Sequence, residues 1–392
     1  MNSKLSTRVQ AVKPSPTLAI TARAAALRAA GEDVIGLGAG EPDFDTPEHI
    51  KVAAKAAIDQ GKTKYTAVDG TATLKQAVID KFKRDNGFDY QPEQILVSSG
   101  GKQSFFNLCQ AILDPGDEVI IPAPYWVSYP DMVVLAGAAP VLVHADASQQ
   151  FKITPAQLEG AITDNTRLFV INSPSNPTGM AYSQEELAAL GEILLNHPRI
   201  VVATDDMYEH ILWPGKSFVN ILNACPDLYP RTLVLNGVSK AYSMTGWRIG
   251  YAGGPADIIK AMKKIQSQST SNPCSISQYA AEAALNGPQD CIAEMLTAFK
   301  SRHDYVVERL NSIDGMQALP SDGTFYVFPQ VEGFIERLNG INDDLELAEY
   351  LIEKAGVALV PGTAFGSPGH IRLSIATSME NLEKALDRIA AI

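Results

Sequence analysis

The chain has 392 residues, of which 46% are hydrophobic and 19% charged, and its length predicts two or three domains of a globular protein. Its formal net charge of -12 argues against nucleic acid or an anionic membrane as a partner, but allows a local basic pocket for an acidic substrate. No apolar run reaches the roughly 18 residues of a membrane span, and the N-terminus has no apolar signal segment, so we expect a cytoplasmic protein. The four cysteines lack metal-ligand spacing, which predicts free thiols and no metal site.

The first part of the chain predicts one helix and one strand. An alanine-rich segment from residue 18 to residue 30 has helical character and is followed by Gly31. Residues 33–37 form a short apolar strand pattern, and a loop extends from Gly38 to Phe44. A further helix is expected from the apolar positions between Ile50 and Ile58, with Gly61 just beyond its end.

From Pro47 onward, short apolar segments alternate with segments of helical periodicity. Ser183 and Glu186 have the spacing of a capping box and predict the start of one helix. The alternation predicts an α/β protein with a largely parallel sheet that is flanked by helices. The expected strands are residues 95–98, 118–121, 140–144, 168–172, 200–204 and 232–235.

The last ninety residues have a different pattern, in which helices and strands do not alternate regularly. A long helix is expected at 291–310 and another near 345–355, strands at 323–328, 357–360 and 371–374, and a closing helix from Thr377. We predict a smaller α+β domain that is built from this end together with the N-terminal segment. The predicted bounds are 1–45 for the N-terminal arm and part of the small domain, 46–295 for the large domain, and 296–392 for the small C-terminal domain.

The stretch from Gly237 to Gly250 is the most specific motif in the chain. It reads GVSKAYSMTGWRIG, and it places Lys240 just past a predicted strand and Arg248 eight residues later. A primary amine that condenses with an aldehyde, together with an arginine that binds phosphate, is what a pyridoxal-phosphate (PLP) site needs. The alternative for a single lysine is a surface position in a loop, which is where most lysines lie.

Other polar and aromatic residues also follow predicted strands, where ligands bind in open α/β sheets. Gly101 and Lys102 follow the strand at 95–98, and Trp126 follows the strand at 118–121. Asn176 comes after the strand at 168–172, and Asp205 ends the strand at 200–204. We therefore expect these side chains to meet at one edge of the sheet.

In order along the chain, these motifs resemble the fold type I PLP enzymes, and among them the class I aminotransferases of the aspartate aminotransferase family. The resemblance extends from Lys13 to Arg372 and is strongest to the bacterial aspartate/prephenate subgroup. It implies a large domain with a mostly parallel, seven-stranded sheet and a smaller α+β domain. It also implies that Lys240 holds PLP covalently and moves a proton, with ping-pong kinetics.

The resemblance assigns roles around the cofactor ring. Asp205 is implied to lie beside the pyridine nitrogen and to favour its protonated form, because an opposite charge stabilises a cation. Tyr208 and Asn176 are implied to hydrogen-bond the ring oxygen, and Trp126 to stack on the ring. Trp126 and Asn176 also border the implied substrate position. The alternatives are structural: a turn for Asp205 or Asn176, and a core position for Trp126.

The resemblance also assigns the residues that hold the phosphate. Gly101 and Lys102 are implied to offer backbone amides at a helix start, and Arg248 a bidentate guanidinium. Ser239 is implied to add a hydroxyl, although some relatives place that serine where this chain has Gly237. Tyr65 matches a tyrosine that reaches the phosphate of the neighbouring subunit, which implies a homodimer with shared sites.

Substrate recognition is implied for four residues. Arg372 matches the arginine that binds the α-carboxylate, and Gly40 offers its backbone to the same group. Lys102 matches a lysine that binds the distal carboxylate of aspartate or glutamate, and Thr17 a threonine that accompanies the use of prephenate. The implied acceptors are 2-oxoglutarate and oxaloacetate. The structural alternatives are that Lys102 is a solvated lysine at a helix start and that Thr17 has no role in binding.

Four other functions compete with this interpretation. An aminotransferase for aromatic or neutral amino acids and a PLP enzyme for carbon–sulfur β-elimination would need no second carboxylate pocket. A regulatory protein with a degenerate PLP domain would not need to retain Lys240, Asp205 and Arg248. A dinucleotide-binding loop is disfavoured, because the glycines before Gly40 are followed by Glu41 and Pro42 and no helix is expected there.

Overall fold

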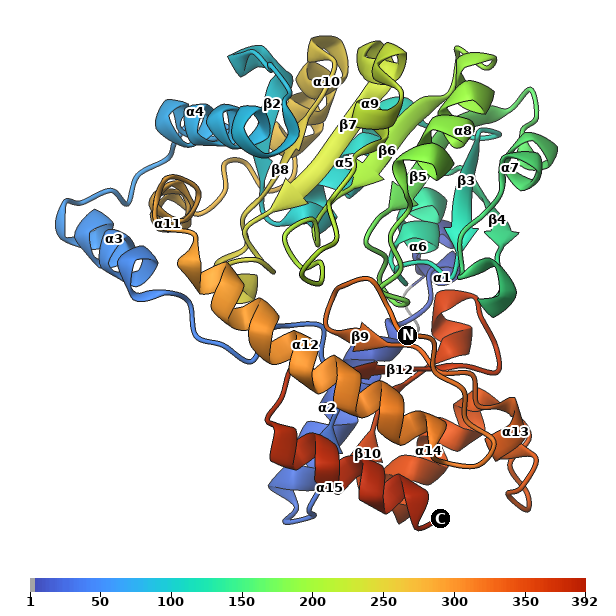
Figure 1. The fold of residues 1–392 in the computed structure, drawn as a ribbon. Helices are drawn as coiled ribbons and strands as arrows, with labels where there is room; N and C mark the ends of the chain where they lie inside the picture. Colours follow the sequence, from blue (N-terminus) through green and yellow to red (C-terminus); the bar gives the residue numbers. More distant parts are fainter. Residues whose placement is uncertain (1–3) are drawn as a thin grey trace.

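The computed structural model describes residues 4–392, so the first three residues of the predicted N-terminal arm lie outside it. The larger part of the molecule, at the top of Figure 1, contains a seven-stranded sheet in the order β2-β8-β7-β6-β5-β3-β4. The pairs from β4 to β7 are parallel, whereas β8 is antiparallel to both of its neighbours. The strands are β2 (Ile95–Ser98), β3 (Glu118–Ala123), β4 (Ala139–His144), β5 (Thr166–Asn172), β6 (Val201–Asp205), β7 (Thr232–Gly237) and β8 (Gly250–Gly253).

Both faces of this sheet are buried. Since successive side chains of a strand point to opposite faces, each strand contributes to two hydrophobic cores. In β5, Phe169 and Ile171 join one hydrophobic core, while Leu168 and Val170 join the core on the other face. The predicted α/β class and mostly parallel sheet are therefore confirmed. The helices against the first core include α3 (Glu48–Asp59), α4 (Ala72–Lys81), α8 (Gln184–Leu195) and α11 (Ser275–Asn286), and those against the second are α5 (Gly101–Ile112), α6 (Tyr129–Leu135) and α10 (Ala256–Ser267).

The predicted capping box is present at the start of α8. The hydroxyl of Ser183 accepts from the backbone N–H of Glu186 at 3.2 Å, and the Glu186 carboxylate accepts from the N–H of Ser183 at 2.7 Å. Strand β8, by contrast, was not expected from the sequence. Its end residues are glycines, and a Cβ at Gly250 would overlap the backbone of Gly101. Gly250, a residue type that is typical of turns, thus allows β8 to approach the start of α5.

The smaller part, at the bottom of Figure 1, is joined to the larger one by the long helix α12 (Asp290–Asn311). It contains the antiparallel sheet β11-β12-β9 and a parallel pair in which β1, near the N-terminus, joins β10. The predicted strand at 323–328 is shorter in the structure, and the one at 357–360 is divided into two. The strands are β1 (Ile35–Gly36), β9 (Tyr326–Val327), β10 (Val357–Ala358), β11 (Val360–Pro361) and β12 (Ile371–Ser374).

The N-terminal segment accompanies the C-terminal part of the chain. Helix α2 (Pro16–Ala29) contacts β1, β10 and β11, and the smaller part has its own hydrophobic core with residues from α12 and the last helix. The domain bounds expected from the sequence stay a prediction. None of the helices among residues 4–392 has the length and apolar character needed to cross a membrane. The remaining helices are α1 (Thr7–Ala11), α7 (Pro155–Ala161), α9 (Ile221–Ala224), α13 (Glu332–Ile335), α14 (Asp344–Lys354) and α15 (Met379–Ala390).

Candidate active site

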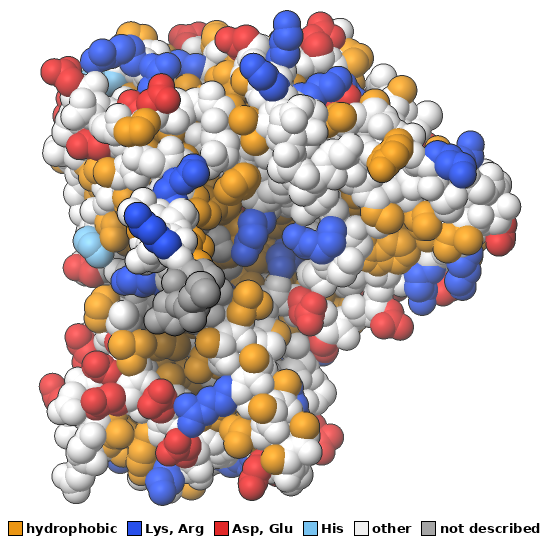
Figure 2. All heavy atoms as spheres, turned by 180° about the vertical axis from the view of Figure 1, so that it is seen from behind, with side chains coloured by type: hydrophobic (Ala, Val, Ile, Leu, Met, Phe, Trp, Pro, Cys, Tyr) orange, Lys and Arg blue, Asp and Glu red, His pale blue; other side chains and the backbone are white. Residues whose placement is uncertain are grey.

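A cavity of about 420 Å³ lies where β5, β6 and β7 end. The sheet register places Asn172 beside Asp205 and Asp205 beside Leu235, so three carboxyl ends meet here, as expected for a ligand site in this kind of sheet. Figure 2 shows lysine and arginine side chains gathered around a hollow between the two parts of the molecule. The predicted site residues that line the cavity are Thr17, Gly40, Gly101, Lys102, Trp126, Asn176, Asp205, Tyr208, Ser239, Lys240, Arg248 and Arg372.

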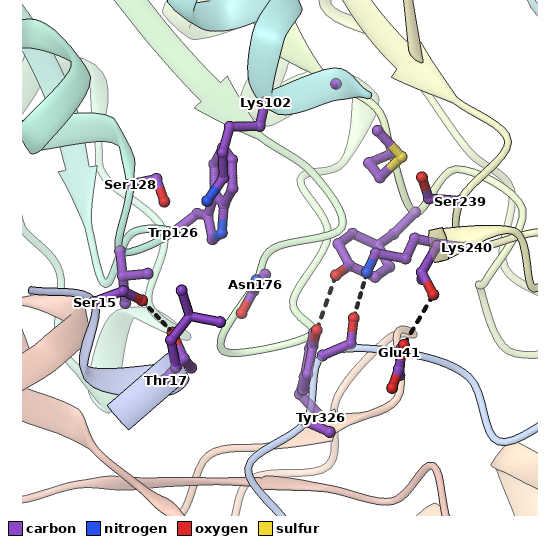
Figure 3. A pocket seen from close by; sticks show the side chains of 18 of the residues that line it. Ser15, Thr17, Glu41, Lys102, Trp126, Ser128, Asn176, Ser239, Lys240 and Tyr326 are labelled. Atoms are coloured by element: carbon purple, nitrogen blue, oxygen red, sulfur yellow. Dashed lines mark hydrogen bonds between the residues drawn. The ribbon is translucent and has the colours of Figure 1, made fainter. Parts of the chain in front are cut away.

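Lys240 extends into the cavity from the loop that follows β7, and its ammonium donates to the backbone oxygen of Gly40 (Figure 3). Its nitrogen lies 5.8 Å from the ring centroid of Phe325. Burial lowers the pKa of Lys240 to about 8, and the positive charge of Arg372 acts in the same direction. The amine is therefore far easier to deprotonate than an ordinary lysine, as a nucleophile or proton carrier requires.

Asp205 ends β6 and presents its carboxylate to the cavity. The hydroxyl of Tyr129 donates to Oδ2 at 2.5 Å, and the backbone N–H of Met207 donates to Oδ1 at 3.3 Å. Burial raises the pKa of Asp205, because a charged carboxylate loses its hydration, although both hydrogen bonds oppose this effect. A cation placed against this carboxylate would be stabilised strongly, which suits a protonated ring nitrogen.

Arg372 lies on β12 with only 2% of its surface exposed. Its guanidinium donates to Oδ1 of Asn176 at 2.9 Å and to the backbone oxygen of Gly38 at 2.8 Å, and it lies over the ring of Tyr326. Its Nε has no hydrogen-bond partner within residues 4–392. A buried guanidinium with an unused N–H beside a cavity can bind the carboxylate of a ligand by donating hydrogen bonds to it.

The start of α5 and Arg248 form a cradle that fits a phosphate. Arg248 has a left-handed backbone conformation, with φ 57°, and its guanidinium donates to the backbone oxygen of Thr245 at 2.9 Å. A Cβ at Gly100 would overlap this guanidinium, so the glycine allows the arginine to approach the start of α5. Backbone N–H groups at a helix start and a guanidinium together favour an anion.

These groups match the chemistry of PLP. The cavity offers an amine for its aldehyde in Lys240, a carboxylate for its ring nitrogen in Asp205, and the Arg248 cradle for its phosphate. The hydroxyl of Tyr208 lies 3.0 Å from that of Tyr326, and Ser239 is buried at the cavity wall. The residues present therefore fit this cofactor.

A second part of the cavity carries the groups predicted for substrate choice. The Lys102 side chain is exposed, and its ammonium lies 5.1 Å from the ring centroid of Trp126. Partial loss of hydration in the cavity lowers the pKa of Lys102, with Arg248 adding to the effect. The Thr17 hydroxyl is 3.1 Å from that of Ser15. In Figure 3 these side chains point into the cavity on the side away from Lys240. A cation and paired hydroxyls suit a distal carboxylate or hydroxyl.

Tyr65 is absent from the cavity walls of its own chain. It lies in the extended segment between α3 and α4, which protrudes from the larger part in Figure 1, and it is 93% exposed. The predicted function in a neighbouring subunit requires such a position.

Sequence reasoning missed several residues of the site. Tyr129 holds Asp205, and Tyr326 meets both Tyr208 and Arg372, yet each lies far along the chain from its partner. Glu41 also lines the cavity and accepts from the Thr245 hydroxyl at 2.9 Å. Only Glu41 had a sequence signal, since it follows the glycine-rich loop; the tyrosines read as ordinary core aromatics.

Known proteins resemble this chain over its whole length. The family model described as aminotransferase class I and II matches residues 32–389. An aspartate/prephenate aminotransferase from Nitrosomonas europaea is 63% identical over 394 residues, covering 99% of each chain. The crystal structure of an aspartate aminotransferase from Rhizobium meliloti has a TM-score of 0.96 at 51% identity, covering 100% of this chain and 98% of that one. The aspartate aminotransferase from Thermus thermophilus, with maleate, has a TM-score of 0.93 at 46% identity, covering 100% of both chains.

Proposed function

The chain belongs to the aminotransferase class I and II family, and we propose that it uses PLP to transfer an amino group between aspartate or glutamate and a 2-oxo acid. The observation that carries this proposal is one cavity that combines Lys240, Asp205 and the Arg248 cradle with two further cations, Arg372 and Lys102. The first set suits the cofactor. The second set suits a substrate with two carboxylates.

Each residue has a definite task in this reaction. PLP, when bound, supplies an electron sink that acidifies the Cα–H of the amino acid. Asp205 keeps the ring nitrogen protonated, and Arg248 anchors the phosphate. Arg372 orients the α-carboxylate, and Nζ of Lys240 takes the proton from Cα. Because donor and acceptor use the same site in turn, the kinetics should be ping-pong.

The preference for dicarboxylates is supported by Lys102 and by the relatives. Lys102 and Arg372 give the cavity two separate cations for two carboxylates. The Thermus thermophilus relative is described with maleate, a dicarboxylate, and the Nitrosomonas europaea relative is called an aspartate/prephenate aminotransferase. We propose that prephenate is a further acceptor, with Thr17 in the cavity wall among the residues that accompany its use. We also propose a role in amino-acid biosynthesis and a cytoplasmic location.

A panel of substrates tests the proposed function. Purified protein with PLP should convert aspartate and glutamate with 2-oxoglutarate or oxaloacetate as the acceptor, and should also accept prephenate. Initial rates at varied donor and acceptor concentrations should give parallel double-reciprocal lines. Release of sulfide or ammonia from cysteine-type substrates, without transamination of aspartate, would instead support β-elimination.

Lys102→Ser should lower kcat/KM for aspartate roughly ten- to a hundredfold, because a hydrogen bond to a charged group contributes about 1.5–3 kcal/mol. Activity toward alanine or an aromatic donor should fall much less, since these donors have no distal carboxylate. Steady-state kinetics with the three donors measures the difference. Equal losses for acidic and neutral donors would show that Lys102 does not bind the distal carboxylate.

We also propose a homodimer in which Tyr65 reaches the phosphate of the partner's cofactor. Tyr65→Phe should then weaken PLP retention about tenfold through loss of one hydroxyl bond to a charged group. The measurement is PLP absorbance remaining after gel filtration at decreasing protein concentration. Tyr305→Phe on α12 serves as a matched control, because Tyr305 lies outside the cavity lining. A fully active monomer at assay dilution would contradict shared sites.

The lowered pKa of Lys240 predicts how cofactor attachment depends on pH. Only the neutral amine attacks an aldehyde, so the attachment rate should rise up to a pH of about 8 and then level off. At pH 7 about one-tenth of the amine would be neutral. Stopped-flow absorbance after mixing cofactor-free protein with PLP measures this profile. A rate that keeps rising toward the ordinary lysine pKa of about 10.4 would show that burial does not act on Lys240 as inferred.

A further inference from the structure

A group of buried charged and amide side chains lies behind the active-site cavity without lining it. We name it the Glu209 cluster, and it consists of Glu209, Lys81, Asn86 and Asn236. The two amides and Glu209 are at most 6% exposed, and Lys81 is fully buried. Charged side chains are seldom buried unless they are paired, so this cluster needs an explanation beyond core packing.

The carboxylate of Glu209 is the centre of the cluster. Its Oε1 accepts from Nδ2 of Asn236 at 2.7 Å, and its Oε2 accepts from Nδ2 of Asn86 at 2.9 Å. The Lys81 ammonium pairs with Oε1 and also donates to Oδ1 of Asn86 at 2.8 Å. The partners come from three different segments: the end of α4, the turn of helix that follows it, and β7. One side chain thus joins all three.

The charges in and around the cluster balance locally. Burial raises the pKa of Glu209, but the ammonium of Lys81, the neighbouring His210 and the hydrogen bond from Asn86 together outweigh it and leave the pKa below its ordinary value. At the edge of the cluster, Asp85 lies 3.9 Å from Lys81 and 3.1 Å from His210, and it is also paired with Arg84. Asp85, Glu209 and His210 are close enough to surround a cation. The Lys81 ammonium already supplies that positive charge, so we infer no metal ion there.

The cluster touches both segments that carry the reacting groups. Glu209 directly follows Tyr208, and Asn236 lies four residues before Lys240. The side-chain oxygen of Asn236 accepts from the backbone N–H of Gly237 at 2.7 Å, so its orientation is fixed at the start of the lysine loop. The bond from Asn236 to Glu209 therefore connects the loop after β6 with the end of β7, from which the Lys240 loop begins.

We propose that Glu209 is a positioning residue: through Asn236 and Lys81 it fixes the segment of Asp205 and Tyr208 against the segment of Lys240. The inference rests on the proposed function. A buried ion pair is seldom more stabilising than apolar residues of the same volume, so its directional bonds are the feature that apolar packing could not replace. An error of about 1 Å between reacting groups can lower a rate about a hundredfold.

Two variants test the proposal in the PLP-loaded enzyme. Lys81→Met/Glu209→Gln removes both charges together, which avoids leaving one charge buried alone. Asn236→Ala leaves the ion pair intact and removes its link to β7, together with the hydrogen bond that Asn236 accepts from Gly237. Lys152→Met/Glu186→Gln is the matched control, because it removes an ion pair with a 2.7 Å contact whose residues do not line the cavity. The glutamine in the control can still cap α8.

Three readouts separate positioning from stability. Both test variants should lower kcat about ten- to a hundredfold with little change in KM. They should also shift the pH midpoint of the visible absorbance of the bound cofactor by about half a unit or more, since Tyr208 and Lys240 move relative to each other. The thermal midpoint of cofactor-free protein should fall no further than in the control, whose kcat and absorbance midpoint should match wild type.

The proposal is overturned if Asn236→Ala retains the kcat and absorbance midpoint of wild type, whatever happens to its thermal stability. It is also overturned if the control variant changes both quantities as much as the test variants do. If the wild-type protein itself fails to transaminate or to bind PLP at Lys240, the proposed function fails instead, and the two failures are thereby distinguished.

Discussion

Lys240→Ala should lose at least about a thousandfold in kcat with every amino donor, the largest effect expected of any single change. The substitution removes both the amine that holds PLP and the group that moves the Cα proton, and proton transfer by a positioned side chain alone contributes about 10²–10⁴-fold. Binding of PLP should persist noncovalently, because Asp205, Arg248 and Trp126 are unchanged. Single-turnover kinetics and equilibrium dialysis measure the two quantities separately.

The matched control is Lys260→Ala, which truncates an exposed lysine on α10 outside the cavity lining and should leave both quantities unchanged. If Lys240→Ala lost PLP binding altogether while remaining folded, the noncovalent contacts would be weaker than inferred. If it retained more than about one-tenth of the wild-type kcat, another group would be moving the proton.

Arg372→Ala should lower kcat/KM at least about a hundredfold for acidic, neutral and aromatic donors alike. Every amino acid has an α-carboxylate, and two charge-assisted hydrogen bonds of about 1.5–3 kcal/mol each would be lost. This uniform loss contrasts with the selective loss expected for Lys102→Ser. Steady-state kinetics with aspartate, alanine and phenylalanine measures it.

Arg372→Lys supplies the comparison that separates charge from geometry. Lysine keeps the positive charge but cannot form the planar, two-point contact of a guanidinium, so an intermediate loss is expected. Thermal unfolding must be measured in parallel, because Arg372 also donates to Asn176 and Gly38 in the folded chain. A loss confined to acidic donors would assign Arg372 to the distal carboxylate instead.

The strands of the large sheet were largely predictable because their apolar runs are unambiguous. The expected strand at 95–98 coincides with β2, and the one at 232–235 lies inside β7. The antiparallel strand β8 was not predictable, since Gly250 and Gly253 resemble a turn. Only tertiary packing explains them: Gly250 faces the backbone at the start of α5, and Gly253 faces the rings of Tyr90 and Phe82. The order of strands is likewise a tertiary property, because local patterns do not say which strands become neighbours.

The candidate site was predictable where chemistry is carried by short motifs. Lys240 and Arg248 share one motif, and Asp205 ends a clear strand, so their meeting at the sheet edge followed from topology. Tyr326 and Tyr129 could not be found this way. Their hydroxyls reach Tyr208 and Asp205 only through packing between segments 118 and 76 residues apart.

Borohydride reduction of the PLP-loaded protein, followed by mapping of the labelled peptide by mass spectrometry, tests whether Lys240 is the residue that holds PLP. Two lysines, Lys240 and Lys102, line the cavity among the residues that the structure describes. We expect one pyridoxyl group per chain, on Lys240, and loss of that label when the substrate aspartate is added before reduction. A label on Lys102 or on any other lysine would contradict this assignment.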